Sequence, residues 1–271
     1  MKEHLRQLVR QGTDDLMRGY LAREYLQARI LECLQDHGVF LRWAFLGGTA
    51  LRFLYEIPRF SENLDFSLIT PGEEAGFRAA LAEVKRFLAR EGYHLEIKVK
   101  DQKTVASALV IFPGLPYELG LSPHATKTLA VRVEVDTNPP AGAELSTTIV
   151  RRHVLLNLCH YDKASLLAGK LHAVLSRPWA KGRDLYDLAW YLAERSWPDP
   201  NLLLLNAALA QTGWTGPAMT EANWRRQVWQ RVEALDWDKA RGDVRPFLER
   251  ERDLALVSAE SIGQLLHRGN E

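Results

Sequence analysis

The sequence predicts an α+β (α/β) protein, in which a mixed sheet with flanking helices is followed by an α-helical C-terminal domain. Between about residues 40 and 155, runs rich in Val, Ile and Thr are interspersed with two helical patterns, which is typical of a sheet domain. From about residue 162 onward, apolar residues recur at helical spacing. The expected parts are an N-terminal helical segment packing on the core, a core domain and a helical domain, at 1–40, 41–158 and 159–271.

The expected elements follow from periodicity and from their stop signals. An amphipathic helix over 14–38 ends at Gly38, and a helix that begins after a Gly-Gly pair cannot continue past Pro58. Another helix is expected at 73–91, before Gly92. Strand-like runs lie at 43–46, 64–69, 93–101, 107–113, 129–137 and 146–156. The later helices are expected at 162–176, 183–195, 200–212, 219–234 and 244–267.

The composition indicates a globular protein of a reducing compartment. The chain has 271 residues, of which 46% are hydrophobic and 25% charged, and its formal net charge is +1. A near-neutral chain binds nucleic acid only through a local basic patch. The two cysteines, Cys33 and Cys159, are far apart and lack the spacing of a zinc site. The N-terminal stretch carries frequent charges and no apolar leader or membrane span, so we expect a cytoplasmic location.

The segment FLGGTAL, residues 45–51, places two glycines between an apolar run and a helix. Glycine tolerates a positive φ angle and, without a Cβ, lets the backbone approach a ligand closely. Thr49 then stands near a helix N-terminus, whose free N–H groups favour an anion. By itself, this pattern fits either the start of an ordinary helix or a phosphate site.

Two strands carry carboxylates on the face opposite their apolar residues. In NLDFSL, the side chains of Asn63, Asp65 and Ser67 share one face, because side chains alternate along a strand. In VRVEVDTN, residues 131–138, the stripe is Arg132, Glu134 and Asp136. Each stripe alone fits a solvated strand face as well as a site for a divalent cation, which prefers hard oxygen ligands.

Taken together, the turn and the two acidic strands have the layout of the nucleotidyltransferase superfamily. Residues 47–68 resemble the AbiEii/AbiGii-type, MenT-like toxin nucleotidyltransferases of toxin–antitoxin and phage-defence systems, in which a Gly-Gly or Gly-Ser turn precedes Arg-x-Ser and Asp-hydrophobic-Asp. Residues 166–188 are similar to the later motifs of that family, a Lys-Leu-His-Ala-like helix followed by Arg-Asp-x-x-Asp-Leu. The resemblance covers about residues 40–195 and implies the nucleotidyltransferase fold.

The resemblance implies a role for each residue at a matching position. The phosphates of the NTP would be held by Gly47, Gly48, Thr49, Arg59, Ser61 and Lys170. The catalytic residues would be Asp65, Asp136, Lys170 and Asp184, and the Mg²⁺ or Mn²⁺ ligands Asp65, Asp136, Asn63 and Glu134. Asp136 would serve as ligand or as base, and Asp184 would orient Lys170.

The residues of the second motif are compatible with these roles. Lys170 lies on a mostly apolar helix, so it either points inward toward an anionic partner or extends its charge to solvent. Asp184 and Asp187 are three residues apart and share a helix face. Nucleic-acid phosphates would be held by a basic patch at Arg177, Lys181 and Arg183, with Arg151 and Arg152 as further candidates. The same patch also fits an ordinary solvated loop.

Asn63 departs from the family pattern, which has Asp at this position. An amide keeps an oxygen acceptor but carries no charge. One explanation is a metal site that relies on Asp65 with Glu134 and Asp136, and a second is an enzyme that is weakened or inactive and retained for binding. A third explanation is that Asn63 is an engineered change made to express a toxic protein.

These observations lead to one functional hypothesis and two alternatives. We expect a metal-dependent nucleotidyltransferase toxin, with a cognate antitoxin, that transfers an NMP from an NTP to the 3′ end of tRNA and releases pyrophosphate. The alternatives are nucleotidylation of a protein hydroxyl, similar to AMPylation, and a catalytically weakened protein that binds nucleotide or a partner. Four C-terminal tryptophans are expected either in the core or on a partner surface: Trp214, Trp224, Trp229 and Trp237.

Overall fold

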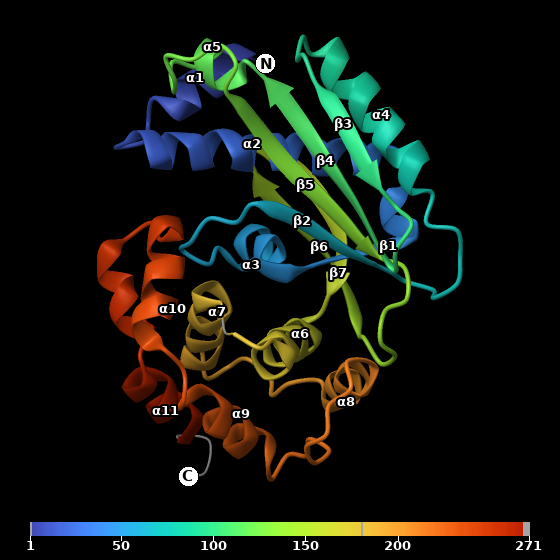
Figure 1. Ribbon diagram of the computed structural model, residues 1–271. Coiled ribbons are helices and arrows are strands. Elements are labelled where there is room, and N and C mark those ends of the chain that lie inside the picture. Colours follow the sequence, from blue (N-terminus) through green and yellow to red (C-terminus); the bar gives the residue numbers. More distant parts are fainter. Residues whose placement is uncertain (1, 180, 268–271) are drawn as a thin grey trace. The chain divides into compact units, whose positions relative to one another are not determined.

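A computed structural model describes residues 2–179 and 181–267, and Figure 1 shows its elements. The chain divides into two compact units. The first, here called the sheet unit, comprises Met1–Glu56, Phe60–Pro139 and Thr147–His160. The second, here called the helical unit, comprises Ile57–Arg59, Pro140–Ser146 and Tyr161–Glu271. The two N-terminal helices thus belong to the same unit as the sheet.

The sheet has seven strands in the order β3-β4-β5-β2-β1-β7-β6. The strands are β1 (Trp43–Leu46), β2 (Asn63–Leu68), β3 (Glu96–Lys100), β4 (Val105–Pro113), β5 (Thr128–Asp136), β6 (Leu145–Arg152) and β7 (Val154–Tyr161). Strand β2 pairs in parallel with β5 and antiparallel with β1, while β4 pairs antiparallel with both β3 and β5. The mixed sheet with flanking helices confirms the predicted fold class.

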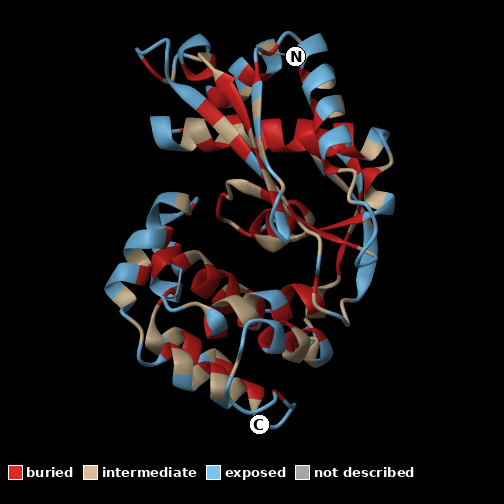
Figure 2. Cartoon of the chain, turned by 45° about the vertical axis from the view of Figure 1, so that its right-hand side comes forward, coloured by how far each residue is buried: buried red, intermediate tan, exposed pale blue. Residues whose placement is uncertain are grey.

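One face of the sheet is apolar and is covered by helices. These are α2 (Asp15–Asp36), α3 (Gly47–Tyr55) and α4 (Phe77–Arg90), and the unit also contains α1 (Lys2–Val9), α5 (Leu115–Glu118) and the 3-10 turn η1 (Val39–Leu41). Helix α2 packs on β5 and α4 on β3, and the ring of Phe53 in α3 contacts Phe45. Alternate residues of β5, including Val131, Val133 and Val135, are fully buried there. Figure 2 shows buried residues on both the strands and the helices of the sheet unit.

The helix predicted at 14–38 is confirmed as α2, and its start and end have clear causes. The side chain of Asp14 accepts a hydrogen bond from the Met17 backbone N–H at 2.8 Å, which satisfies a free donor of the first turn. Gly38, with φ +67°, follows the last turn. Within the helix, Glu24 is buried and paired with three basic side chains, Arg52 at 2.6 Å, Arg152 at 3.0 Å and His153 at 2.9 Å.

The prediction of a single strand at 146–156 is wrong. This segment forms parts of two strands, β6 and β7, which are separated at His153. His153 has φ +62°, a left-handed conformation that few non-glycine residues adopt. Its ring bonds Glu24, so a contact with α2 accompanies the turn. No glycine or proline marks this turn locally, so the strand propensity of the flanking residues conceals it.

The helical unit contains six α-helices in its described part. They are α6 (Lys163–Ser176), α7 (Gly182–Ala193), α8 (Leu202–Gln211), α9 (Trp224–Val232), α10 (Trp237–Val244) and α11 (Ala259–His267). The long helix predicted at 244–267 is wrong: the chain there forms two 3-10 turns, η2 (Arg245–Phe247) and η3 (Glu251–Leu256), before α11. Pro246 lies in η2 and cannot continue the ladder of α10.

Trp224 is fully buried in the helical unit, whereas Trp214, Trp229 and Trp237 are half-buried. The tryptophans are therefore not a continuous exposed surface. Among the described residues, every helix is either too short or too polar to cross a bilayer.

Candidate active site

The diglycine turn lies directly against a carboxylate of the neighbouring strand. Strand β1 ends at Leu46 and α3 begins at Gly47, which has φ +80°. A Cβ added at Gly47 would lie 2.6 Å from the Oδ2 atom of Asp65, closer than real Cβ contacts allow. Both the backbone angle and the space therefore require glycine at this position. The turn brings the N-terminus of a helix next to Asp65.

Thr49 fixes this turn to β2. Its buried hydroxyl donates a hydrogen bond to the backbone carbonyl of Asn63. The side chain predicted to bind phosphate is thus engaged within the protein. An anion at the turn would instead meet the backbone N–H groups of Gly47 and Gly48, because Leu46 at the N-cap position supplies no side-chain acceptor for them.

Asp65 and Asp136 lie on the same face of adjacent parallel strands. Asp65 is in register with Glu134, and Ser67 is in register with Asp136. Registered residues of paired strands point to the same side, and the face alternates every second residue. The predicted carboxylates of β2 and β5 therefore share the face opposite the one that α2, α3 and α4 cover.

The two acids that β5 contributes to this face differ in their partners. Asp136 is half-buried and accepts the backbone N–H of Asn138 at 2.9 Å, and burial raises the pKa of its carboxyl group. In the described part of the chain, no basic side chain pairs with Asp136. Glu134, in contrast, accepts the Ser107 hydroxyl at 3.0 Å and lies 3.8 Å from Arg132 Nη1. Asp136 is thus the acid of β5 whose charge still lacks a counter-charge.

These donors fit a magnesium ion that takes its other ligands from the substrate. Mg²⁺ binds through one or two carboxylates together with substrate phosphates and water. Asp65 and Asp136 supply two carboxylates, and the predicted ligand Asn63 adds an amide on the same face. Among the described residues, no group of three or more His, Cys, Asp or Glu side chains forms a metal cage of its own.

The helical unit holds a second, separate cluster of charges around Lys170. Lys170 Nζ of α6 lies 2.7 Å from Asp187 Oδ2 and 3.2 Å from Asp184 Oδ1, both on α7. Arg59 donates twice to Asp187, from Nε and Nη2, at 2.5 Å each. Arg177 Nη1 pairs with Asp184 Oδ2. Three cations and two carboxylates leave the cluster with one net positive charge.

The charges of the cluster oppose the effect of burial on the pKa values of Lys170 and Asp184. Burial alone would lower the pKa of Lys170, but the carboxylates of Asp187 and Asp184 raise it above its ordinary value. Burial would raise the pKa of Asp184, and the charges of Lys170 and Arg177 lower it instead. Of the two orientations that the sequence left open for Lys170, the structure has the inward one, in contact with Asp184 and Asp187.

Asp187 is the member of this cluster to which the sequence assigned no role. It is fully buried and makes the bidentate contact with Arg59. The spacing of Asp184 and Asp187, one helical turn apart, was the available signal. Arg59 was predicted to bind phosphate. In the structure, its guanidinium donates two hydrogen bonds to the Asp187 carboxylate. Ser61, next in the motif, is half-buried in the sheet unit, and its carbonyl accepts Gln27 Nε2 at 3.2 Å.

Some of the basic residues predicted to bind nucleic acid instead contact other side chains of the protein. Arg177 pairs with Asp184, and the guanidinium of Arg183 lies 4.2 Å from the ring centre of Phe247. Lys181 is exposed at the start of α7. In the sheet unit, Arg152 pairs with Glu24, whereas Arg151 is exposed.

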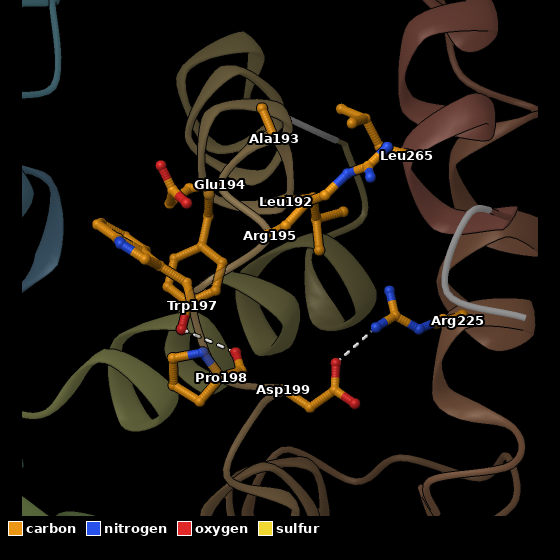
Figure 3. Close-up of a pocket in the computed structure, with 10 residues that line it drawn as sticks. Leu192, Ala193, Glu194, Arg195, Trp197, Pro198, Asp199, Arg225 and Leu265 are labelled. Atoms are coloured by element: carbon orange, nitrogen blue, oxygen red, sulfur yellow. Dashed lines mark hydrogen bonds and ion pairs between the residues drawn. The ribbon is translucent and has the colours of Figure 1, made fainter. Parts of the chain in front are cut away.

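The helical unit also contains a cavity of about 600 Å³ that the sequence did not indicate. Figure 3 shows Trp197, Arg195 and Arg225 around it, with Arg225 paired to Asp199 at 2.5 Å. Its size is that of small-molecule sites. It lies beyond the C-terminal end of α7, about 15 Å along the helix axis from Asp184, at 1.5 Å per residue. None of the predicted site residues lines it.

Comparisons with known proteins agree with this fold. In fold, the chain is similar to a crystal structure described as a nucleotidyltransferase from H. pylori, with a TM-score of 0.55, 18% identity and coverage of 92% of this chain and 95% of that one. It is also similar to MenT4, a nucleotidyltransferase toxin from Mycobacterium tuberculosis H37Rv, with a TM-score of 0.52, 19% identity and coverage of 98% and 99%. No curated protein matches its sequence.

The family assignment comes from the sequence. Residues 29–262 match the model of the family described as nucleotidyl transferase AbiEii toxin, type IV TA system. The match includes the diglycine turn, both acidic strands and the Lys170 cluster. The chain therefore belongs to the AbiEii nucleotidyltransferase toxin family of type IV toxin–antitoxin systems.

Proposed function

We propose that this nucleotidyltransferase transfers an NMP from an NTP to the 3′ end of tRNA in a reaction that depends on Mg²⁺ or Mn²⁺. The observation that carries the proposal is the pair of carboxylates, Asp65 and Asp136, on one sheet face beside the Gly47 turn. A blocked tRNA 3′ end would account for toxicity, and a role in phage defence and a cytoplasmic location follow from the same hypothesis.

The chemistry assigns a task to each group. The acceptor hydroxyl oxygen attacks the α-phosphorus, the bond from that phosphorus to the bridging oxygen of the β-phosphate breaks, and pyrophosphate leaves. A bound divalent metal would neutralise charge that develops on the phosphate oxygens. Asp65 would hold that metal, and Asp136 would serve either as its second carboxylate ligand or as base for the hydroxyl.

Positive charge and backbone donors would hold the triphosphate. The N–H groups of Gly47 and Gly48 suit an anionic oxygen at the start of α3. Lys170 carries charge that its two carboxylate partners keep in place. We assign it to the leaving pyrophosphate, with Asp184 and Asp187 as positioning residues.

The test is transfer of label from an α-phosphate-labelled NTP to total RNA and, separately, to total protein, with Mg²⁺ or Mn²⁺. Labelled tRNA with 3′ ends extended by at least one nucleotide is expected, and none with Asp65→Ala. Label on protein alone would establish nucleotidylation of a protein hydroxyl instead. No transfer to either fraction would favour the weakened binding protein that Asn63 suggests.

A further inference from the structure

The face that carries Asp65 on β2 and Asp136 on β5 continues across two more strands, β4 and β3, without a change of side. The registers place Lys100, Ser107, Glu134 and Asp65 in one row across β3, β4, β5 and β2. The neighbouring row is Lys98, Leu109, Arg132 and Asn63. Helices α2, α3 and α4 pack on the opposite face, so these rows form one surface of the sheet unit.

The far end of this surface is exposed and positively charged. Lys98 and Lys100 are exposed, and in the described residues neither makes an ion pair. Arg132 is 48% exposed and lies between them and the carboxylates. Glu134, the acid in the same rows, is already engaged by Ser107 and Arg132. Glu96 is also exposed on this face of β3, so Lys98, Lys100 and Arg132, set against Glu96 and Glu134, leave one net positive charge on this part of the face.

The spacing of these lysines matches a strand of nucleic acid that reaches the carboxylates. Lys98 and Lys100 lie two residues apart along β3, or about 7 Å. Three strand spacings separate β3 from β2, or about 14 Å. At about 3.4 Å per stacked nucleotide, this distance corresponds to about four nucleotides. Half-buried Leu109 gives the path an apolar floor between the basic groups.

We propose, on the basis of the function proposed above, that this exposed sheet face holds the acceptor strand of an RNA. The phosphates about three to four nucleotides before the reacting end lie on Lys98 and Lys100, and the strand crosses β4 and β5 toward Asp65 and Asp136. Affinity for the acceptor would then come from a few phosphate contacts, which is consistent with a chain of net charge +1. An acidic protein segment is the competing occupant.

The test compares wild-type protein with the double variant Lys98→Ala/Lys100→Ala in transfer to unfractionated tRNA. The KM for tRNA is expected to rise about tenfold at 0.15 M salt, and the slope of log KM against log salt to fall by about 1.4, at about 0.7 per lost contact with a single strand. The KM for the NTP should stay unchanged. A dinucleotide acceptor should be insensitive to the substitutions, because it reaches the carboxylates but not β3.

The matched control is Lys85→Ala/Arg90→Ala on α4, which removes two exposed charges from the helix that covers the other face. This variant should behave as wild type with both acceptors. An unchanged KM and salt slope in the β3 variant, with wild type active on tRNA, would overturn the path and leave the proposed function standing. Wild-type transfer to protein alone would refute both, and loss of that transfer in the β3 variant would identify an acidic protein as the occupant.

Discussion

Gly47 and Asp65 are in direct contact: a side chain at Gly47 would meet the Asp65 carboxylate at 2.6 Å. The turn and the acid therefore depend on each other, although 18 positions separate them in the sequence. A helix N-terminus favours an anionic phosphate oxygen, and a neighbouring carboxylate can bind a cation that also contacts the phosphate.

We expect Gly47→Ala to impair transfer more than it impairs folding. The new methyl group displaces the Asp65 carboxylate, and alanine at φ +80° costs about 1–2 kcal/mol of stability. The rate constant kcat should fall at least about tenfold, which corresponds to about 1.4 kcal/mol in the barrier. Gly19→Ala on α2 is the control, because a Cβ there meets no atom within 4 Å. Equal activity of both variants would contradict the contact.

The substitutions Asp65→Asn and Asn63→Asp test which side chains hold the metal. Loss of one of two carboxylate ligands should reduce kcat/KM at least about a hundredfold, or about 2.7 kcal/mol. Asn63→Asp should change it less than about threefold, or less than about 0.7 kcal/mol. The measurement is the rate of transfer as a function of Mg²⁺ concentration. A large gain in Asn63→Asp would show that the metal site needs a carboxylate at position 63.

The alternation of β2 and β5 let the sequence predict which residues share the catalytic face. A period of two is local, so Asp65 and Asp136 could be placed on the side opposite Leu64 and Val135 without coordinates. The register that sets Asp65 opposite Glu134 is a long-range pairing, and nothing local encodes it.

The partner of Arg59 could not be predicted from the sequence either, because it is also a long-range contact. The motif suggested a phosphate ligand, whereas the structure pairs Arg59 with Asp187, 128 positions away. The segment Ile57–Arg59 belongs to the helical unit even though the strands on either side of it do not. Only the i,i+3 spacing of the two acids on α7 hinted that both would face inward.

Asp187→Asn should destabilise the helical unit. It leaves the fully buried Arg59 guanidinium and Lys170 with a neutral partner, and breaking a buried pair costs about 3–5 kcal/mol. Urea unfolding, followed by the fluorescence of buried Trp224, measures the loss. Asp199→Asn, which removes an acid that is 61% exposed from its pair with Arg225, should cost less than about 1 kcal/mol. Similar midpoints for the two variants would show that the Arg59 pair is not needed for folding.

The lowered pKa of Glu24 leads us to expect that the sheet unit loses stability at acidic pH. Burial would raise its pKa, but the hydrogen bond from His153 and the charges of Arg52 and Arg152 outweigh burial and lower it from 4.5 to about 2. A depressed folded-state pKa contributes stability that is present above pH 4.5 and is lost as the pH falls toward 2. The difference corresponds to about 3 kcal/mol.

Glu24→Gln removes this titration, and the free energy of unfolding should therefore fall less steeply between pH 4.5 and pH 2 than in wild type. The variant starts from lower stability at pH 7, because Arg52 is buried and loses its charged partner. Denaturant unfolding at a series of pH values gives both quantities. Glu3→Gln on α1, at a side chain that is 64% exposed, should run parallel to wild type. A Glu24→Gln curve that is also parallel would mean that the Glu24 carboxylate titrates alike in the folded and unfolded chain.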